Sequence, residues 1–281
     1  MQRENLPSNT SSTNNLIDKP TNIKAVFFDI DGTLVSFKTR SIHESTVTAI
    51  RKLQQKGIKV IVATGRSIHA TQPIQHLQFD GFITFNGSYC ADKDKNILFR
   101  KTIDPNSIQG LLDYTENHTL NFVLMYENRI AVNEVTPVIN EMHSKLNLPV
   151  PPLLDRQQAD SSNVLQANIF ISPEEEAAFM KTVMPDCLAA RWTPLFADVN
   201  PAGISKKIGV EIFCNYFGID VAETMSFGDG GNDIEMLKHT GIGIAMGNAG
   251  EEVKAVADYV TADSDQDGIS KALGYFGVLD V

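Results

Sequence analysis

The chain has 281 residues, which at about 150 residues per domain predicts two domains. Its 42% hydrophobic and 21% charged residues are typical of a folded protein, and no apolar stretch approaches the roughly 18 residues that a membrane-spanning helix needs. The formal net charge of −10 argues against nucleic acid as the main partner. Three scattered cysteines without a C-x-x-C pair argue against disulfides and thiolate zinc sites, and they favour a reducing cytoplasm.

The first stretch of the chain is too polar to fold. Residues 1–22 are rich in Ser, Thr, Asn and Gln, and they contain no apolar segment of the length that a signal peptide needs. Such a composition cannot bury enough apolar surface to offset the entropy lost on ordering. We therefore expect residues 1–22 to form a disordered arm, with the folded part beginning at residue 23.

Buried strands and amphipathic helices then alternate. The apolar run 25–28 ends in a polar turn at 29–33, a pattern that predicts a buried strand followed by a loop. The segment Ser41-Ile42-His43-Glu44 has the form of a capping box, which predicts a helix that starts at Ser41 and ends near Gly57. The next predicted elements are a strand at 58–63, a helix at 68–77 and a strand at 82–85. This alternation predicts βαβ units and a parallel sheet.

The alternation of strands and helices resumes near the end of the chain, after a long segment with a different sequence pattern. Its predicted elements are a helix from Ser205 to Gly218, a strand at 224–227, a helix around 234–237, a strand at 242–246, a helix at 251–257, a strand at 259–260 and a last helix from Asp267. In between, the predicted elements are a hairpin at 92–96, helices at 107–117, 137–146 and 173–184, and strands at 122–126, 164–171 and 187–192. The predicted fold class is therefore α/β. A Rossmann-like parallel sheet is formed by 23–87 and 199–281, and an α+β domain is inserted at 88–198.

Polar side chains follow three of the predicted strands. Asp29 and Asp31 follow the first strand, Thr64 follows the second, and Asp229 and Asp233 follow a late one. The carboxyl ends of parallel strands meet at one sheet edge, where ligands bind. Aspartates also cap helices and form turns, but four carboxylates gathered at one edge repel each other unless a cation binds. All-oxygen ligation suits Mg²⁺, so the sequence predicts a magnesium site there.

Four segments resemble the four motifs of the haloacid dehalogenase superfamily. They are Asp29-Ile30-Asp31-Gly32-Thr33, Thr64-Gly65-Arg66, Lys206 within Gly203-Ile204-Ser205-Lys206, and Gly228-Asp229-Gly230-Gly231-Asn232-Asp233. The resemblance spans 23–281 and is strongest to the Cof-type (subclass IIB) sugar phosphatases, which share an Asn-Gly pair like Asn86-Gly87 and an Ala-Met-Gly-Asn-Ala segment like 245–249. That branch usually carries Lys-Gly where this chain has Lys206-Lys207. Lys206 fits the register, so we expect Lys207 to face solvent.

The resemblance implies a phosphatase that acts through an aspartyl-phosphate. It implies that Asp29 is the nucleophile and that Asp31 protonates the leaving oxygen and later deprotonates water. It also implies that Mg²⁺ binds the carboxylates of Asp29 and Asp229 and the backbone carbonyl of Asp31, with Asp233 completing the shell directly or through water. The implied catalytic residues are Asp29, Asp31, Thr64 and Lys206.

The same resemblance implies which residues bind the substrate. Thr64 and the Gly65 amide are expected to donate to the phosphoryl oxygens, and Lys206 to neutralise charge on Asp29 and the phosphate. Asn232 is expected to contact either the phosphate or the metal shell. Arg66 is expected to touch the substrate, or alternatively to form a salt bridge with an acidic neighbour.

The long insertion resembles a C2-type cap. Only 32 residues separate Asp31 from Thr64, which leaves room for a helix and a strand but for no lid. We therefore expect the segment 88–198 to close over the sheet edge and to select the leaving group. Asn86 is expected to organise the crossing into this cap. The candidate selector residues are Arg129, Asn168, Arg191 and Trp192.

The predicted function is Mg²⁺-dependent hydrolysis of small phosphomonoesters, chiefly sugar phosphates, in the cytoplasm. Two alternatives remain: a phosphosugar mutase with the same nucleophile, and a non-catalytic ligand sensor. Dehalogenation is disfavoured because carbon–halogen displacement needs neither the second acid, Asp31, nor a metal site. We expect a small phosphorylated metabolite as partner, no nucleic acid or membrane, and a monomer or weak dimer.

Overall fold

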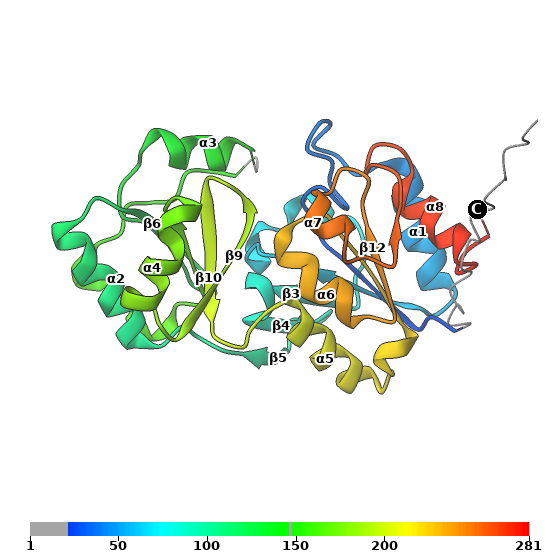
Figure 1. The fold of residues 1–281 in the computed structure, drawn as a ribbon. Coiled ribbons are helices and arrows are strands. Elements are labelled where there is room, and N and C mark those ends of the chain that lie inside the picture. Colours follow the sequence, from blue (N-terminus) through cyan, green and yellow to red (C-terminus); the bar gives the residue numbers. More distant parts are fainter. Residues whose placement is uncertain (1–21, 146–147, 281) are drawn as a thin grey trace, which may run out of the picture.

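The computed structural model describes residues 22–280 except 146–147. The predicted arm at 1–22 therefore lies outside the described residues, apart from residue 22. Two lobes lie side by side, and each contains one β-sheet (Figure 1). None of the helices in the described part of the chain is long and apolar enough to cross a membrane.

The larger sheet has eight strands among the described residues, in the order β13-β12-β11-β1-β2-β3-β4-β5. The strands are β1 (Ala25–Phe28), β2 (Lys59–Ala63), β3 (Gly81–Thr84), β4 (Tyr89–Asp92), β5 (Ile97–Arg100), β11 (Thr224–Gly228), β12 (Ile242–Ala245) and β13 (Tyr259–Val260). All pairs from β13 to β3 are parallel, and β4 and β5 add an antiparallel hairpin at one end. The predicted Rossmann-like parallel sheet is confirmed.

Helices cover both faces of this sheet, as a parallel sheet requires. They are α1 (Glu44–Gln55), α5 (Lys206–Phe217), α6 (Ile234–His239), α7 (Glu251–Lys254) and α8 (Gly268–Tyr275). Alternate residues of β1 point to opposite sides: Val26 and Phe28 pack in the core that contains α1 and α8, whereas Phe27 packs with α5 and α6. Because both faces are buried, the strands are continuous apolar runs instead of alternating ones.

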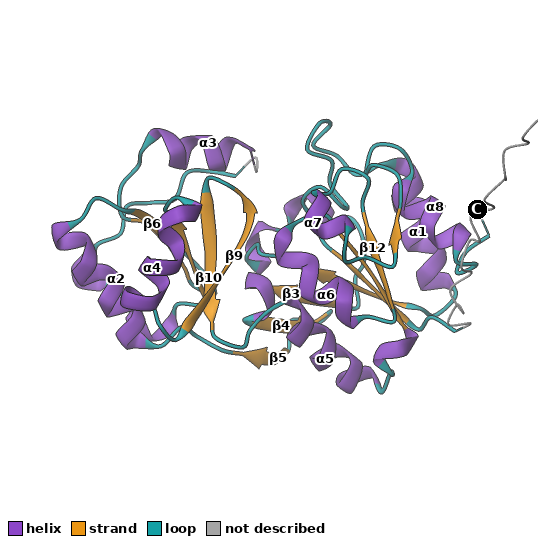
Figure 2. Cartoon of the chain, viewed as in Figure 1, coloured by secondary structure: helices purple, strands orange, loops and turns teal. Residues whose placement is uncertain are grey.

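The smaller sheet is antiparallel, with the order β7-β6-β8-β10-β9. Its elements are α2 (Pro105–Asn117), β6 (Asn121–Met125), β7 (Ile130–Val132), α3 (Pro137–Lys145), β8 (Gln166–Phe170), α4 (Pro173–Val183), β9 (Cys187–Thr193) and β10 (Phe196–Pro201). Helices α2 and α4 cover one face, on the side of the lobe away from the larger sheet (Figure 2). On the other face, Ile139 of α3 packs against Val123 of β6 and Val132 of β7. We call this lobe the cap and the other lobe the core.

Several local predictions were wrong. The N-cap of α1 is His43, whose ring accepts from the Ser45 amide, so the helix begins at Glu44 without the Ser41 capping box. The predicted helix at 68–77 consists of two short 3-10 turns. Strands β7 and β10 carry no clear sequence signal and were missed. Strand β10 nevertheless lies inside the cap sheet, where its pairing to β8 and β9 decides its conformation.

The chain crosses between the lobes twice, after β5 and after β10. Strands β4 and β5 fall within the predicted cap range 88–198, but they pair with β3 and so extend the core sheet. The five strands of the cap sheet all lie between residues 121 and 201. The boundaries at residues 88 and 198 stay a prediction. The sheet pairing alone favours crossings just after Arg100 and Pro201.

Candidate active site

The predicted site residues converge at the carboxyl ends of the central core strands. Asp29 directly follows β1, Thr64 follows β2, and Asp229 follows β11. All three line one cavity of about 470 Å³, together with Asp31 and Asn232. This cavity lies between the core and the cap, because residues of both lobes form its wall.

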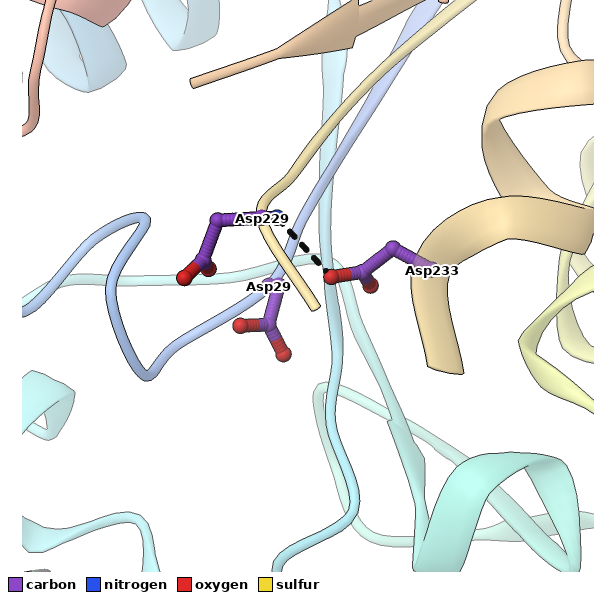
Figure 3. Close-up of side chains that lie close together, drawn as sticks. All are labelled: Asp29, Asp229 and Asp233. Atoms are coloured by element: carbon purple, nitrogen blue, oxygen red, sulfur yellow. Dashed lines mark hydrogen bonds between the residues drawn. The ribbon is translucent and has the colours of Figure 1, made fainter. Parts of the chain in front are cut away.

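Three carboxylates meet at the floor of the site. Asp29, Asp229 and Asp233 each offer an oxygen atom, and these oxygens lie within 4.8 Å of one another (Figure 3). Burial and the neighbouring acids raise the pKa values of Asp29 and Asp229. Burial raises the pKa of Asp29 to about 7, and burial followed by the charges of Asp29 and Asp233 raises that of Asp229 well above its usual value. Such an all-oxygen cluster suits a hard divalent cation.

Within this cluster, the Asp233 side chain is hydrogen-bonded to Lys206 and to the loop that carries Asp229. Its Oδ2 accepts from the backbone amides of Asp229 and Gly230, at 3.0 Å each, and its Oδ1 accepts from the Lys206 ammonium at 2.7 Å. The side chain is completely buried. Asp233 therefore fixes the loop that carries Asp229, and Asp29 and Asp229 are the carboxylates best placed to hold a cation. Direct or water-mediated ligation by Asp233 stays a prediction.

Lys206 is the positive counterpart of these acids. Its Nζ donates to Asp29 Oδ1 and to Asp233 Oδ1, each at 2.7 Å, and no part of its side chain is exposed. Burial lowers the pKa of Lys206, but the charges of Asp233 and Asp29 outweigh that effect and raise it above the usual value. The neighbouring Lys207 lies at the surface near Glu211. Lys206 is thus the inward-facing lysine.

Asp31 is paired with Arg66. The guanidinium donates from Nε to Asp31 Oδ2 and from Nη2 to Asp31 Oδ1, both at 2.7 Å, and its Nη1 donates to the Ala70 carbonyl at 2.8 Å. Arg66 is buried, and its pKa is raised because the bond and charge of Asp31 exceed the opposing effect of burial. The salt bridge that we gave as the alternative for Arg66 is present in this structure.

Thr64 and Gly65 form the turn after β2. The Thr64 hydroxyl accepts from the Arg66 amide at 3.1 Å, which leaves its own proton to donate toward the cavity. Gly65 also lines the cavity, and its carbonyl accepts from Gln166 of the cap at 3.2 Å. This turn is therefore tied to both the core and the cap.

Two residues that sequence reasoning did not assign hold Asp229 in place. The Thr33 hydroxyl donates to Asp229 Oδ1 at 3.0 Å, and the Asn248 amide donates to Asp229 Oδ2 at 3.3 Å and to the Gly32 carbonyl at 2.9 Å. Gly32 has a φ of +84°, and a Cβ there would lie 2.1 Å from Asp229 Oδ2. The resemblance contains both Thr33 and Asn248 within its motifs, but their roles depend on the folded geometry.

A buried polar network joins the two lobes beside the site. The Asn86 amide donates to Asp198 Oδ2 at 2.9 Å and to Gln166 Oε1 at 3.1 Å, and its carbonyl oxygen accepts from Asn232 at 3.0 Å. Asn168 donates to Asp198 Oδ1 at 2.5 Å. Burial raises the pKa of Asp198 to about 6, against the opposing effect of these bonds. The sequence singled out Asn86, but it gave no signal for Asp198, which lies in the missed strand β10.

The two lobes also touch through backbone atoms. A Cβ on Gly231 would lie 2.3 Å from the Arg191 carbonyl oxygen in β9. Only glycine allows the loop after β11 to approach the cap this closely. The cap therefore rests directly on the loop that carries Asp229.

The candidate selector residues differ in where they lie. Asn168 and Arg191 line the cavity, whereas Arg129 lies 4.4 Å over the Tyr126 ring and is not among the lining residues. Arg191 is bonded to Glu176 and to the carbonyls of Ile171 and Pro194. The side chain of Trp192 lies outside the described part of the chain.

Comparisons with known proteins place this arrangement in a family. Residues 26–273 match the haloacid dehalogenase-like hydrolases. The chain is 33% identical to the Bacillus subtilis protein YkrA over 258 residues, covering 91% of this chain and 98% of YkrA. It is 30% identical to the 5-amino-6-(5-phospho-D-ribitylamino)uracil phosphatase YcsE of Bacillus subtilis over 256 residues, covering 90% of this chain and 96% of that protein.

Solved structures agree in fold and sequence. The subclass IIB sugar phosphatase BT4131 is 41% identical, with a TM-score of 0.86, and the match covers 91% of this chain and 100% of that one. The phosphatase BT1666 from Bacteroides thetaiotaomicron is 36% identical, also with a TM-score of 0.86, over 95% of this chain and 100% of the other. With the paired acids at the ends of β1 and β11, these matches show that the chain is a phosphatase and belongs to the haloacid dehalogenase-like hydrolases, in the Cof-type branch.

Proposed function

We propose that the chain is a Mg²⁺-dependent phosphatase that hydrolyses small phosphomonoesters through an aspartyl-phosphate on Asp29. The observation that carries this proposal is the position of Asp29. Its carboxylate lies at the end of β1, 2.7 Å from the Lys206 ammonium, and it shares the cluster with Asp229 at the floor of a cavity of about 470 Å³. A carboxylate held in this way is fixed for attack on a phosphorus atom that enters from the cavity.

The reaction follows from the two aspartates. An oxygen of Asp29 bonds to phosphorus while the ester P–O bond breaks, and the leaving alkoxide takes a proton from Asp31. A water molecule then gives a proton to Asp31 and bonds to phosphorus as the bond from Asp29 to phosphorus breaks, which releases inorganic phosphate. Arg66 holds Asp31 between these two steps through its pair of hydrogen bonds.

The proposed ligands of the cation are two carboxylates and one backbone carbonyl. Asp29 and Asp229 would hold Mg²⁺ through their carboxylates, with the Asp31 backbone carbonyl as a further predicted ligand and Asp233 at the edge of the shell. A bound Mg²⁺ would neutralise negative charge on the phosphoryl oxygens. Thr33 and Asn248 keep the Asp229 carboxylate in the orientation that this requires.

The remaining residues bind the phosphoryl group. Lys206 supplies a fixed positive charge next to Asp29, and the Thr64 hydroxyl and Gly65 amide supply hydrogen-bond donors at the cavity wall. Asn232 also lines the cavity, while its amide donates to Asn86. Preorganised charge of this kind is the largest single contribution in most phosphoryl transfers.

We further propose sugar phosphates and related phosphorylated metabolites as substrates, in the cytoplasm. Two observations support this proposal: similarity to a protein named as a sugar phosphatase, and similarity to one named as a ribitylaminouracil phosphatase. Three buried free cysteines, Cys90, Cys187 and Cys214, fit a reducing compartment. A monomer or weak dimer stays our expectation.

Release of inorganic phosphate from p-nitrophenyl phosphate tests the proposed reaction. We expect Asp29→Asn to lower the rate by about three orders of magnitude or more while the circular dichroism spectrum stays unchanged. Asp94→Asn, in the exposed β4–β5 turn, is the matched control and should retain full activity. An undiminished rate in Asp29→Asn would refute the assignment, and transfer of phosphate to a second hydroxyl without free phosphate would identify a mutase.

A further inference from the structure

The cavity has two chemically different ends. The end at the core strands is polar and carries Asp29, Thr64 and Arg66. The cap side of the cavity carries the apolar side chains of Val123, Met125, Ile130, Met142 and Phe196. Phe37, in the loop after β1, also lines the cavity, but it lies beside Gly32 and Asp229 on the core side. A substrate whose phosphorus lies at Asp29 therefore extends its leaving group toward an apolar wall.

Several polar side chains of this wall already have internal partners, whereas the ring nitrogens of His143, which also lines the cavity, have none in the described part of the chain. Gln166 donates to the Gly65 carbonyl and accepts from Asn86. Asp198 accepts from Asn86 on one oxygen and from Asn168 on the other. Because these groups hold the two lobes together, they have little capacity left for hydroxyl groups of a substrate.

The same holds for the basic residue of the wall. Arg191 is bonded to the Glu176 carboxylate and to two backbone carbonyls, so its guanidinium is committed to the cap. The Thr193 hydroxyl accepts from the Leu195 amide, which leaves its own proton to donate. A hydroxyl-rich leaving group at this end could bond to Thr193 and His143, but its other hydroxyl groups would exchange hydrogen bonds to water for contact with apolar carbon, at a cost in affinity.

We propose that the leaving alcohol carries a flat aromatic or heterocyclic ring that packs against Met125, Ile130 and Met142. The proposal rests on the proposed phosphatase function and specifies its substrate class. Thioether side chains adapt to the shape of a ring and make favourable sulfur–aromatic contacts. Met125 lies directly opposite Ile130 in the β6–β7 pair, and Met142 of α3 lines the same cavity from the cap.

The size of the cavity agrees with this substrate class. Its volume of about 470 Å³ falls within the roughly 300–1,000 Å³ of sites that enclose a ligand larger than a single small group. The substrate is therefore a phosphomonoester in which a short polar or aliphatic linker joins the phosphate to a ring. A phosphorylated sugar that bears a ring meets this description, whereas a bare hexose phosphate leaves the apolar wall in contact with hydroxyl groups.

Propyl phosphate and 3-phenylpropyl phosphate test the proposal as a matched pair. Both release a primary alcohol of similar acidity, so a difference in kcat/KM reports on contact with the ring and not on the bond that breaks. Burial of a phenyl ring predicts a kcat/KM about 10- to 100-fold higher for 3-phenylpropyl phosphate. A ratio below about threefold overturns the proposal.

Substitutions at Ile130 test whether the ring contacts the cap side of the cavity. Ile130, half-buried in β7, lines the cavity, whereas Leu188 in β9 is exposed and is not among the lining residues. We expect Ile130→Ser to lower the phenylpropyl-to-propyl ratio about fivefold or more, Ile130→Leu to retain it, and the control Leu188→Ser to leave it unchanged. A ratio that stays at the wild-type value in Ile130→Ser overturns the proposed wall, provided that thermal melting shows a folded protein.

The same assay separates this inference from the proposed function. If wild-type protein releases phosphate from p-nitrophenyl phosphate and from both alkyl phosphates at similar kcat/KM, the phosphatase function stands and the ring-binding wall is refuted. If none of the three esters releases phosphate in the presence of Mg²⁺, the proposed function fails first. Isothermal titration with 3-phenylpropylphosphonate then decides whether the wall binds a ring: binding at least tenfold tighter than propylphosphonate supports it, and equal binding overturns it.

Discussion

The Arg66 guanidinium holds the Asp31 carboxylate through two parallel hydrogen bonds of 2.7 Å each. The two residues come from different strand ends, 35 positions apart in the sequence. Arg66 is further fixed by its bond to the Ala70 carbonyl. The position of the proposed acid is therefore set by the turn after β2 and not by the Asp31 loop alone, because a bidentate pair constrains both distance and orientation.

Replacement of Arg66 tests this relationship. We expect Arg66→Gln to lower the free energy of unfolding by about 3 kcal/mol, because it leaves the partly buried Asp31 carboxylate without its cation. We also expect kcat to fall at least about tenfold, since Asp31 loses its fixed position. Urea denaturation and steady-state kinetics measure the two effects. In a double-mutant cycle with Asp31→Asn the losses should not add, and simple additivity would contradict the pairing.

The two adjacent lysines give a matched pair of variants. Lys206→Met removes the buried ammonium that both Asp29 and Asp233 contact, and we expect kcat/KM for an aryl phosphate to fall about 100-fold or more. Lys207→Met removes a surface ammonium that lies 3.8 Å from Glu211, and we expect less than a twofold change. Equal losses in the two variants would show that Lys206 has no special role at the site.

Magnesium binding is testable without turnover. A cation that binds the folded state at 100 times its Kd stabilises it by about 2.7 kcal/mol, so Mg²⁺ should raise the melting temperature of the protein by several degrees. We expect Asp229→Asn to abolish this rise and EDTA to reverse it in the wild type. Asp265→Asn, which changes an acid outside the cluster, should behave like the wild type. An unchanged rise in Asp229→Asn would place the cation elsewhere.

Asp198 makes stability depend on pH. Burial raises its pKa from 3.8 to about 6, so the folded state binds this proton more tightly than the unfolded chain does. The resulting stabilisation is complete below about pH 4 and is lost as the pH rises through 6, by about 3 kcal/mol in total. We expect Asp198→Asn to flatten this fall when urea unfolding is measured between pH 4.5 and 7.5. Identical slopes in the two proteins would show that Asp198 stays ionised throughout.

Local sequence was enough to predict the core of the fold. Short apolar runs bounded by polar turns predicted β1, β2 and β11, because strands of a buried parallel sheet have no polar face to interrupt the run. The capping box at Ser41 was a false signal, since the backbone becomes helical only after His43. Helix α5 does end at Gly218, which adopts a left-handed conformation with φ +67°. The strand runs and the Gly218 stop depend on a few neighbouring residues, so local rules predicted them, whereas the capping-box rule failed at Ser41.

The sequence by itself determined which residues are candidates for the site. These are the acids that follow two strand ends, the hydroxyl of Thr64 and the lysine at position 206. Only the tertiary structure decided how they are paired. In the fold, Lys206 forms ion pairs with both Asp29 and Asp233, and Arg66 is hydrogen-bonded to Asp31. Asp198, in the strand β10 that was missed, accepts a hydrogen bond from Asn86. These partners lie between 27 and 177 positions apart, and a contact across such a separation depends on how sheets and lobes pack, which no local pattern encodes.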